Sequence, residues 1–263
     1  ILIENRLVKE WRPKTVSLAR TVLTSIIGSK PKAMRQIPRA AIADYGVNDI
    51  TSDDVLQWRL SLQVQASTAH RYQRMLEQFL SLLGNPVKAA KPKVRAPEIR
   101  ILTREEQVHL LNRAVQPRTR LALAILLNWG LRSGEACGLM HEDRHEDGIL
   151  LRRQVIENNG QVIIDENLKT DESRAWLPFM DDYLDAEIGA PRTGFVLATR
   201  PGTPMRPSKL RNMVQSVAEF TTYEGITPHE IRHTAGVNLL RAGVDPATAA
   251  SITRHSIDTL LKI

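Results

Sequence analysis

The sequence predicts a mainly α-helical protein with a small antiparallel β-sheet. Three observations support this fold class. Amphipathic helix patterns fill the first 86 residues, a segment rich in proline and cations follows, and short strand-like segments surround an Asn-Gly turn in the second half. The expected domains are therefore a helical domain at 1–86, a basic linker at 87–100 and an α+β domain at 101–263.

Four helices are predicted in the first domain, where apolar residues recur at helical spacing: 15–27, 32–45, 51–62 and 67–83. Gly28 and Gly84 supply helix stops, and Thr51-Ser-Asp-Asp54, with acids in the first turn, is typical of a helix start. The apolar stripe of the last helix includes Leu80 and Leu83. Its polar side carries four side chains that could meet a DNA backbone or could form an ordinary solvated face: His70, Arg71, Gln73 and Arg74.

The charge of the chain is concentrated in this first part. Residues 1–95 hold 16 Lys and Arg against 7 Asp and Glu, a net charge of +9, out of 36 and 29 in the whole chain; the remainder, with 20 and 22, has a net charge of −2. This distribution favours a polyanionic partner such as nucleic acid, although solubility alone would explain it equally well. In the linker, Lys88, Lys91 and Lys93 would contact phosphates where it crosses a duplex.

The second domain opens with a capping box formed by Thr103 and Glu106. An almost wholly apolar helix at 118–129 then breaks at Gly130, and a new helix starts at Ser133. Arg132 stands at this junction with Glu135 three residues later. Because a half-buried arginine must be paired, we expect Glu135 to be its partner.

Strand-like segments follow at 148–156, 161–164 and 174–177, with Asn158-Asn-Gly160 as a hairpin turn between the first two. Lys169 falls on the turn before the third strand, where it could reach a neighbouring site or point into solvent. Further helices are predicted at 181–187 and 208–220.

Composition and the absence of certain sequence patterns exclude several classes of protein. No apolar run approaches the roughly 20 residues that span a bilayer, and no signal-peptide pattern opens the chain. The single cysteine, Cys137, excludes an internal disulfide and a cysteine-rich zinc site. His141 and His145 have a spacing that a metal could use, but no further ligands are grouped with them, so a metal site is not favoured. We expect a cytoplasmic protein, and a first residue of Ile1 rather than Met is typical of a fragment.

The stretch Thr227-Pro-His-Glu-Ile-Arg-His-Thr234 groups cationic donors on one helical turn. Pro228 suits a first helical position, and His229 and Arg232 then share a face. A histidine next to a guanidinium suits a phosphate diester, although this pattern alone also fits a solvated helix face. His255 precedes a last helix that starts near Ser256.

Taken together, these motifs resemble the tyrosine recombinase family of phage integrases and their chromosomal relatives. The order of the motifs carries the resemblance: a helical domain ending in Asn85-Pro86, Leu-Thr-x-Glu-Glu at 102–106, Gly-Leu-Arg-x-x-Glu at 130–135, a lysine on a β-turn, His-x-x-Arg-His-Thr at 229–234, and His-Ser at 255–256. The resemblance implies a helical core-binding domain, joined to an α+β catalytic domain.

The resemblance also implies roles for the candidate residues. Arg132 and Arg232 would grip the non-bridging oxygens of the scissile phosphate, and Lys169 would be the general acid for the 5′-hydroxyl leaving group. His229 and His255 would assist proton movement and phosphate binding, with Glu135 supporting the site. Fixed cations can stabilise the charge of phosphoryl transfer, so no metal and no cofactor are implied.

The chain departs from the family pattern at two places. Arg254 precedes the last histidine, where the family usually has glycine. The nucleophilic tyrosine belongs nine residues beyond His255, at position 264, just after Ile263. The four tyrosines present are interpreted as structural or surface residues: Tyr45, Tyr72, Tyr183 and Tyr223. As it stands, the chain should bind and clamp DNA without cleaving it, and C-terminal truncation is the favoured explanation.

The leading hypothesis is a site-specific DNA recombinase of the integrase type that forms a 3′-phosphotyrosyl intermediate, with double-stranded DNA as its partner. By resemblance, the complete protein would work as a homotetramer on two duplexes, associated with the nucleoid of a bacterial or phage-infected cell. The alternative is a non-cleaving DNA-binding regulator built on the same scaffold. A helical adaptor that binds protein is disfavoured by the basic first domain.

Overall fold

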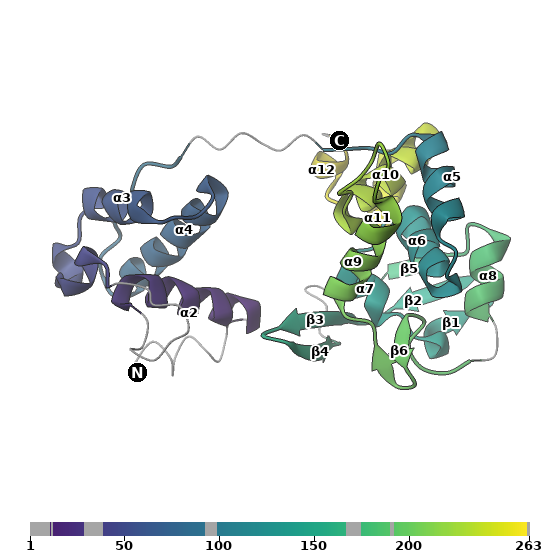
Figure 1. The fold of residues 1–263 in the computed structure, drawn as a ribbon, viewed down its shortest axis with the longest axis horizontal. Coiled ribbons are helices and arrows are strands. Elements are labelled where there is room, and N and C mark those ends of the chain that lie inside the picture. Colours follow the sequence, from purple (N-terminus) through teal and green to yellow (C-terminus); the bar gives the residue numbers. More distant parts are fainter. Residues whose placement is uncertain are drawn as a thin grey trace. The chain divides into compact units, whose positions relative to one another are not determined.

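The computed structural model describes residue 11 and residues 13–28, 39–92, 99–166, 175–189 and 192–261. The chain divides into two compact units, Ile1–Pro97 and Glu98–Ile263 (Figure 1). No helix within the described ranges is long and apolar enough to cross a membrane.

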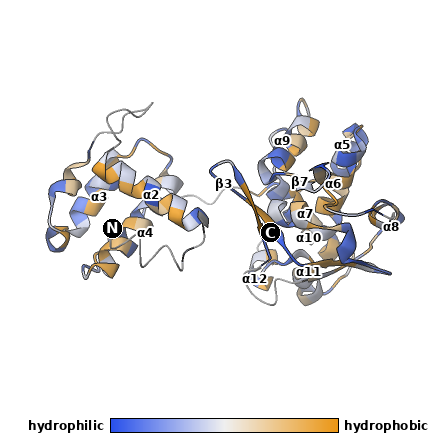
Figure 2. Cartoon of the chain, turned by 90° about the horizontal axis from the view of Figure 1, so that it is seen from below, coloured by the Kyte–Doolittle hydropathy of each residue, from blue (hydrophilic) through white to orange (hydrophobic). Residues whose placement is uncertain are grey.

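Unit 1 is built from short helices whose apolar faces meet in one core. Its elements are α2 (Pro13–Ile27), the 3-10 helices η1 (Ala41–Asp44) and η2 (Val47–Asp49), α3 (Ser52–Ser61) and α4 (Ala66–Leu82). Val22, Trp58 and Phe79 lie at the centre of that core, each at most 3% exposed. Figure 2 shows the alternation of hydrophobic and hydrophilic residues along α2 that this packing requires.

Three of the four helices predicted in this unit are confirmed. The hydroxyl of Thr51 accepts a hydrogen bond from the Asp54 backbone N–H, and Asp54 accepts from that of Thr51, so the predicted start of α3 is a capping box. Gly28 and Gly84 end α2 and α4 with left-handed backbone, at φ 84° and φ 95°. Leu83, expected on the apolar stripe, is instead the C-cap residue of α4 and is 46% exposed.

The prediction of a helix at 32–45 is wrong over its described part, because residues 41–44 form only the 3-10 helix η1. The Arg39 guanidinium donates to the Ala43 carbonyl and pairs with Asp44, which favours a tight local turn. Ala40, before the turn, has extended backbone. Residues 32–38 lie outside the described ranges.

A buried polar network in unit 1 corrects the expected surface of α4. Gln73, predicted on the polar side, is only 1% exposed, and its side-chain amide donates to the Ala89 carbonyl at 3.0 Å. Arg59 donates to Gln73 at 2.7 Å and to the Ala90 carbonyl at 2.6 Å. These bonds hold residues 89–90, at the start of the segment expected as linker, against unit 1. Arg71, Arg74, Lys88 and Lys91 are exposed, whereas Lys93 lies outside the described residues.

Unit 2 combines helices with short antiparallel strands. The helices are α5 (Arg104–Arg113), α6 (Pro117–Trp129), α7 (Ser133–Gly138), η3 (His141–Asp143), α8 (Asp182–Gly189), α9 (Pro207–Ala218), α10 (Pro228–Arg241), α11 (Pro246–Thr253) and α12 (Ile257–Leu260). The strands are β1 (Arg144–His145), β2 (Gly148–Leu151), β3 (Gln154–Asn158), β4 (Gln161–Asp165), β5 (Ala175–Pro178), β6 (Ala198–Arg200) and β7 (Thr203–Pro204). The predicted mainly helical fold with small antiparallel sheets is confirmed.

The described strands form three sheets, with the orders β1-β2-β5, β3-β4 and β6-β7. The segment 148–156, predicted as one strand, is two strands in different sheets. Arg152 and Arg153 lie between the two strands and belong to neither. Both of their guanidiniums pair with the buried carboxylate of Asp143. The Asn-Gly turn is confirmed, since Asn159 and Gly160 have φ 50° and 76° between β3 and β4.

The core of unit 2 forms around α6, which packs against α10 (Figure 1). The seven consecutive residues at 121–127 are all buried. Trp129, at the end of the helix, is fully buried and donates through Nε1 to the Pro178 carbonyl of β5 at 2.7 Å. The predicted buried helix at 118–129 is therefore confirmed as the central element of this unit.

Two glycines let α7 approach β3 closely. A Cβ atom on Gly134 would lie 2.6 Å from the Val155 carbonyl oxygen, and one on Gly138 would lie 2.6 Å from that of Arg153. Because both obstacles are backbone atoms, a side chain at either position would push the helix away from the strand. This contact fixes α7, and with it the position of Glu135.

We predict that Gly138→Ala destabilises unit 2 by about 1 to 3 kcal/mol, as overpacking against fixed backbone does. The measurement is urea unfolding of the 263-residue chain. Gly236→Ala in α10 is the matched control, because the close contact of its Cβ, at 2.6 Å, is with the end of the Leu260 side chain, which can rotate, and the His255 ring lies at an ordinary 3.8 Å. Equal losses in the two variants would contradict the close-approach argument.

Candidate active site

The site begins at the sharp break between α6 and α7. Gly130 ends α6 in the left-handed region, at φ 57°, where a Cβ would lie 3.3 Å from the Arg232 carbonyl oxygen. Arg132 is the N-cap of α7, and its backbone N–H donates to Glu135 Oε2 at 2.8 Å. Its guanidinium also donates to Glu135 Oε1 at 2.9 Å. The predicted pairing of Arg132 with Glu135 is therefore present.

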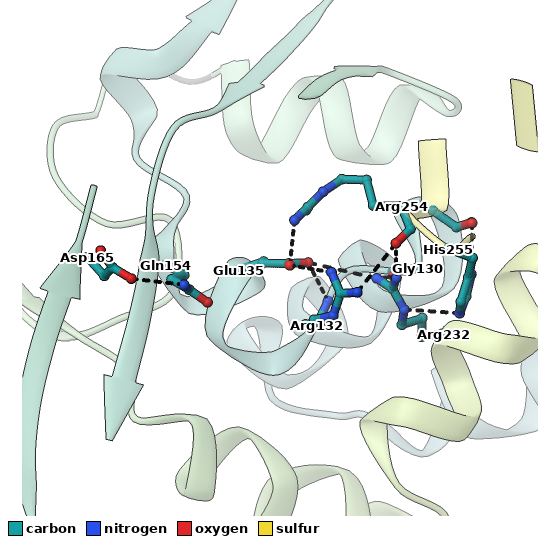
Figure 3. Close-up of polar contacts among 9 residues, drawn as sticks. Gly130, Arg132, Glu135, Gln154, Asp165, Arg232, Arg254 and His255 are labelled. Carbon is teal, nitrogen blue, oxygen red and sulfur yellow. Dashed lines mark hydrogen bonds and ion pairs between the residues drawn. The ribbon is translucent and has the colours of Figure 1, made fainter. Parts of the chain in front are cut away.

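Glu135 is shared by three arginines (Figure 3). Besides Arg132, Arg254 Nη2 donates to Glu135 Oε1 at 2.5 Å, and Arg232 Nη1 lies 3.8 Å from Oε2. The carboxylate side chain is 3% exposed, whereas the three guanidinium side chains are 54%, 8% and 1% exposed for Arg132, Arg254 and Arg232. Arg132 is thus the member of the cluster that solvent or a ligand can reach.

Arg232 is buried, and its guanidinium donates hydrogen bonds to three partners. Nη1 donates to the Gly130 carbonyl at 2.7 Å, Nη2 to the Arg254 carbonyl at 2.7 Å, and Nε to His255 Nε2 at 3.1 Å. Thr227 starts α10 with a capping box closed by Glu230, which positions this turn of the helix. Arg232 therefore ties the α6–α7 break to the loop after α11.

The contacts of His255 define its tautomer. Arg232 Nε can only donate, so Nε2 of His255 is the acceptor and carries no proton. Nδ1 lies 2.9 Å from Thr253 Oγ1, whose own proton goes to the Ala249 carbonyl at 2.7 Å. Hence Nδ1 of His255 carries the proton and donates to Thr253. The ring is held as the neutral form.

Three histidines pack against one another next to Arg232. The ring of His233 stacks on that of His255 at 5.2 Å between centroids and meets His229 edge-on at 4.3 Å. Burial and then the charge of Arg232 lower the pKa of His255 to about 3. Burial and the neighbouring His229 lower the pKa of His233 to about 4, and burial followed by the arginines lowers the pKa of His229.

The charge of the cluster stays positive at neutral pH. Burial would raise the pKa of Glu135, but the charges of Arg254 and Arg132 outweigh it, so its pKa is lowered and it is ionised. Burial, followed by Arg132, lowers the pKa of Arg232 to about 9, which leaves it protonated. Three guanidiniums and one carboxylate give +3 − 1, a net charge of +2 in a largely buried group. Such a group attracts an anion.

The structure brings together five of the sequence-predicted site residues: Arg132, Glu135, His229, Arg232 and His255. Lys169 lies outside the described residues, so its placement stays a prediction. Sequence reasoning did not assign Arg254 or His233 to the site. The signal for Arg254 was its departure from the family's glycine, whereas His233 was visible only as the second histidine of His-x-x-Arg-His.

The histidines at 141 and 145 lie away from this cluster. His141 Nδ1 is 3.1 Å from the Ile188 carbonyl, and the His145 ring packs edge-on against Trp176. Within the described ranges, no three His, Cys, Asp or Glu side chains gather where they could hold a metal ion.

A helical unit followed by an α+β unit in which arginines and histidines gather is the arrangement that the sequence motifs predict for a tyrosine recombinase. Residues 101–263 match the sequence model of the phage integrase family. Since this match covers more than half of the chain, the chain belongs to the phage integrase family.

Individual relatives agree with this assignment. The chain is 29% identical to the tyrosine recombinase XerA of Thermococcus kodakarensis over 205 residues, a match that covers 75% of this chain but only 66% of that relative. Among solved structures, the Tn1549 transposon integrase in complex with circular intermediate DNA matches with a TM-score of 0.75 at 19% identity, covering 99% of this chain and 92% of that one. A lambda integrase tetramer bound to a Holliday junction matches with a TM-score of 0.61 at 17% identity, covering 95% and 74%. These two likenesses show the shared fold.

We predict that unit 2 loses stability as the pH falls from 7 to 5. The pKa values of His255 and His233 are lowered in the folded chain, so the unfolded chain takes up protons near its ordinary histidine pKa while the folded chain does not. The measurement is the urea midpoint as a function of pH. His255→Gln should flatten this slope, with His145→Gln, an exposed residue outside the cluster, as the control. An unchanged slope in His255→Gln would show that the buried neutral ring is not the cause.

Proposed function

We propose that this chain is the DNA-binding and catalytic core of a site-specific DNA recombinase of the integrase type. The single observation that carries the proposal is the cluster around Glu135, where a net charge of +2 is held in place and one guanidinium, that of Arg132, faces outward. Phosphoryl transfer places extra negative charge on phosphate oxygens, and fixed cations of this kind stabilise it.

In this proposal Arg132 binds a non-bridging oxygen of the scissile phosphate through its exposed guanidinium. Arg232 has two N–H groups that no described hydrogen bond uses, but it is 1% exposed, so it reaches the phosphate only when a neighbouring side chain moves aside. Lys169 remains the proposed general acid on the resemblance alone. His229, exposed at the start of α10, would exchange protons near the phosphate.

The proposed nucleophile is a tyrosine at position 264. None of the four tyrosines in the sequence is tied to the cluster by a described contact: Tyr223 is hydrogen-bonded to His109, Tyr183 lies under Arg120, and Tyr45 and Tyr72 belong to unit 1. Attack by such a tyrosine joins its oxygen to the phosphorus and releases the 5′-hydroxyl. The 3′-phosphotyrosyl bond conserves the energy needed for rejoining.

Unit 1 is proposed to hold the duplex through its exposed cations. Arg71 and Arg74 lie three residues apart on α4 and are both exposed, as are Lys88 and Lys91 after it. Spacing of this kind places both arginines on one helix face, toward one stretch of phosphates. A homotetramer on two duplexes is the proposed assembly; a lambda integrase of the same fold forms a tetramer bound to a Holliday junction.

The proposal predicts covalent protein–DNA adducts from a longer polypeptide that includes residue 264. In that polypeptide, Arg132→Ala should slow adduct formation by about a hundredfold or more, the usual loss when one donor to a developing oxyanion is removed. Arg232→Lys should slow it too while preserving a buried positive charge, which Arg232→Ala would not.

The measurement is the rate of adduct formation in denaturing gels, together with duplex affinity. Arg200→Ala, an exposed arginine of β6 outside the cluster, is the control and should leave the rate unchanged. A polypeptide that binds duplexes and never forms adducts would instead be the non-cleaving regulator.

A second prediction concerns duplex binding by unit 1. Replacing both Arg71 and Arg74 with alanine should reduce the slope of log affinity against log salt by about 2, because each phosphate contact contributes about 0.9. The matched control is Arg39→Ala, whose guanidinium is already paired with Asp44 at 2.8 Å. An unchanged slope in the double variant would remove α4 from the DNA interface.

A further inference from the structure

Residue 254 adopts a backbone conformation that suits glycine. It is the C-cap of α11 with φ 56° and ψ 38°, in the left-handed region that disfavours a residue with a Cβ. A glycine would adopt this backbone without strain and would leave the carbonyl where it is. What Arg254 adds to the structure is therefore its side chain.

Arg254 contacts every charged member of the cluster. Its carbonyl accepts from Arg232 Nη2 at 2.7 Å and from Arg132 Nη2 at 3.4 Å, while its own Nη2 donates to Glu135 at 2.5 Å (Figure 3). The side chain is 8% exposed, and its Nη1 is buried without a hydrogen-bond partner in the described structure. The described hydrogen bond of the Arg254 guanidinium goes to the Glu135 carboxylate. Any effect of Arg254 on the site should therefore pass through Glu135.

The charges of Arg132, Glu135 and Arg254 indicate how Arg254 affects the site. Arg254 and Arg132 hold the same oxygen, Oε1 of Glu135, at 2.5 and 2.9 Å. Without the Arg254 side chain, Glu135 would face only Arg132 and Arg232, and its charge would cancel one of these two cations. With it, a net charge of +2 remains for a ligand, and the pull of Glu135 on Arg132 is shared.

We propose that Arg254 is a positioning residue of the oxyanion site: by pairing with Glu135, it leaves the exposed guanidinium of Arg132 available to bind a phosphate. This inference rests on the proposed function, in which Arg132 binds the phosphate. The 8% exposure of Arg254 against the 54% of Arg132 favours action through Glu135 over direct contact with the ligand.

The experiment measures binding of tungstate, a tetrahedral dianion whose charge does not change near neutral pH, to the 263-residue chain by calorimetry. Arg254→Gly should weaken binding about tenfold, the loss expected when one cation of a shared cluster is removed. Arg132→Ala should weaken it at least as much. Arg254→Lys, which keeps the charge, should restore part of the affinity.

Thermal melting separates this effect from folding. Phe220→Gly is the matched control, because Phe220 is a second non-glycine residue in the left-handed region, at φ 59°, and is 92% exposed outside the cluster. It should leave tungstate binding unchanged. Arg254→Gly should melt as a cooperative folded protein while binding weakly, and the partial rescue by Arg254→Lys tests the charge even where the glycine variant is unstable.

A variant of Glu135 tests whether Arg254 acts through this carboxylate. In Glu135→Gln no carboxylate competes with the anion for Arg132, so Arg254→Gly should weaken tungstate binding by clearly less than the tenfold expected in the wild-type background. A full tenfold loss in the Glu135→Gln background would overturn the positioning role and indicate that Arg254 acts on the anion without Glu135.

Two further outcomes distinguish the inference from the proposed function. If Arg254→Gly binds like the wild type while Arg132→Ala does not, the oxyanion site stands and the role of Arg254 is rejected. If the wild-type chain does not bind tungstate, or Arg132→Ala binds it normally, the oxyanion site itself is rejected, and the role of Arg254 with it.

Discussion

The pairing of the buried Glu135 carboxylate with arginines is the interaction on which the candidate site of unit 2 depends. A carboxylate that is 3% exposed requires compensation, and three guanidiniums supply it from three separate segments of the chain. Arg132 comes from the break after α6, Arg232 from α10 and Arg254 from the loop after α11. Satisfying one charge therefore fixes the relative positions of the elements that line the candidate site.

The close packing around this carboxylate explains several features that look unrelated in the sequence. Gly134 and Gly138 allow α7 to lie against β3, and Gly130 makes the turn that places Arg132 as an N-cap. The same arrangement holds His255 neutral, because Arg232 offers it only a donor. An arginine cluster can thus be buried without losing its positive charge, and it retains one cation at the surface for a phosphate.

Local patterns in the sequence were sufficient for most elements and for much of the site. The helix start at Thr51, the capping box at Thr103, the Asn-Gly hairpin and the apolar helix before Gly130 were predicted and are present, because each depends on residues within a few positions of one another. The pairing of Arg132 with Glu135 follows the same three-residue spacing. The resemblance to the recombinases added, from the order of the motifs, the other residues expected at the same site.

By itself, the sequence determined the fold class, the family and five residues of the candidate site. Only the tertiary structure decided how those residues share their charges. The hydrogen bond between Arg254 and Glu135 joins positions 119 residues apart, and Gln73 is buried by the backbone of residue 89, which lies 16 positions away. No local spacing encodes such contacts, because they form only when separate elements pack and polar groups removed from water must find partners.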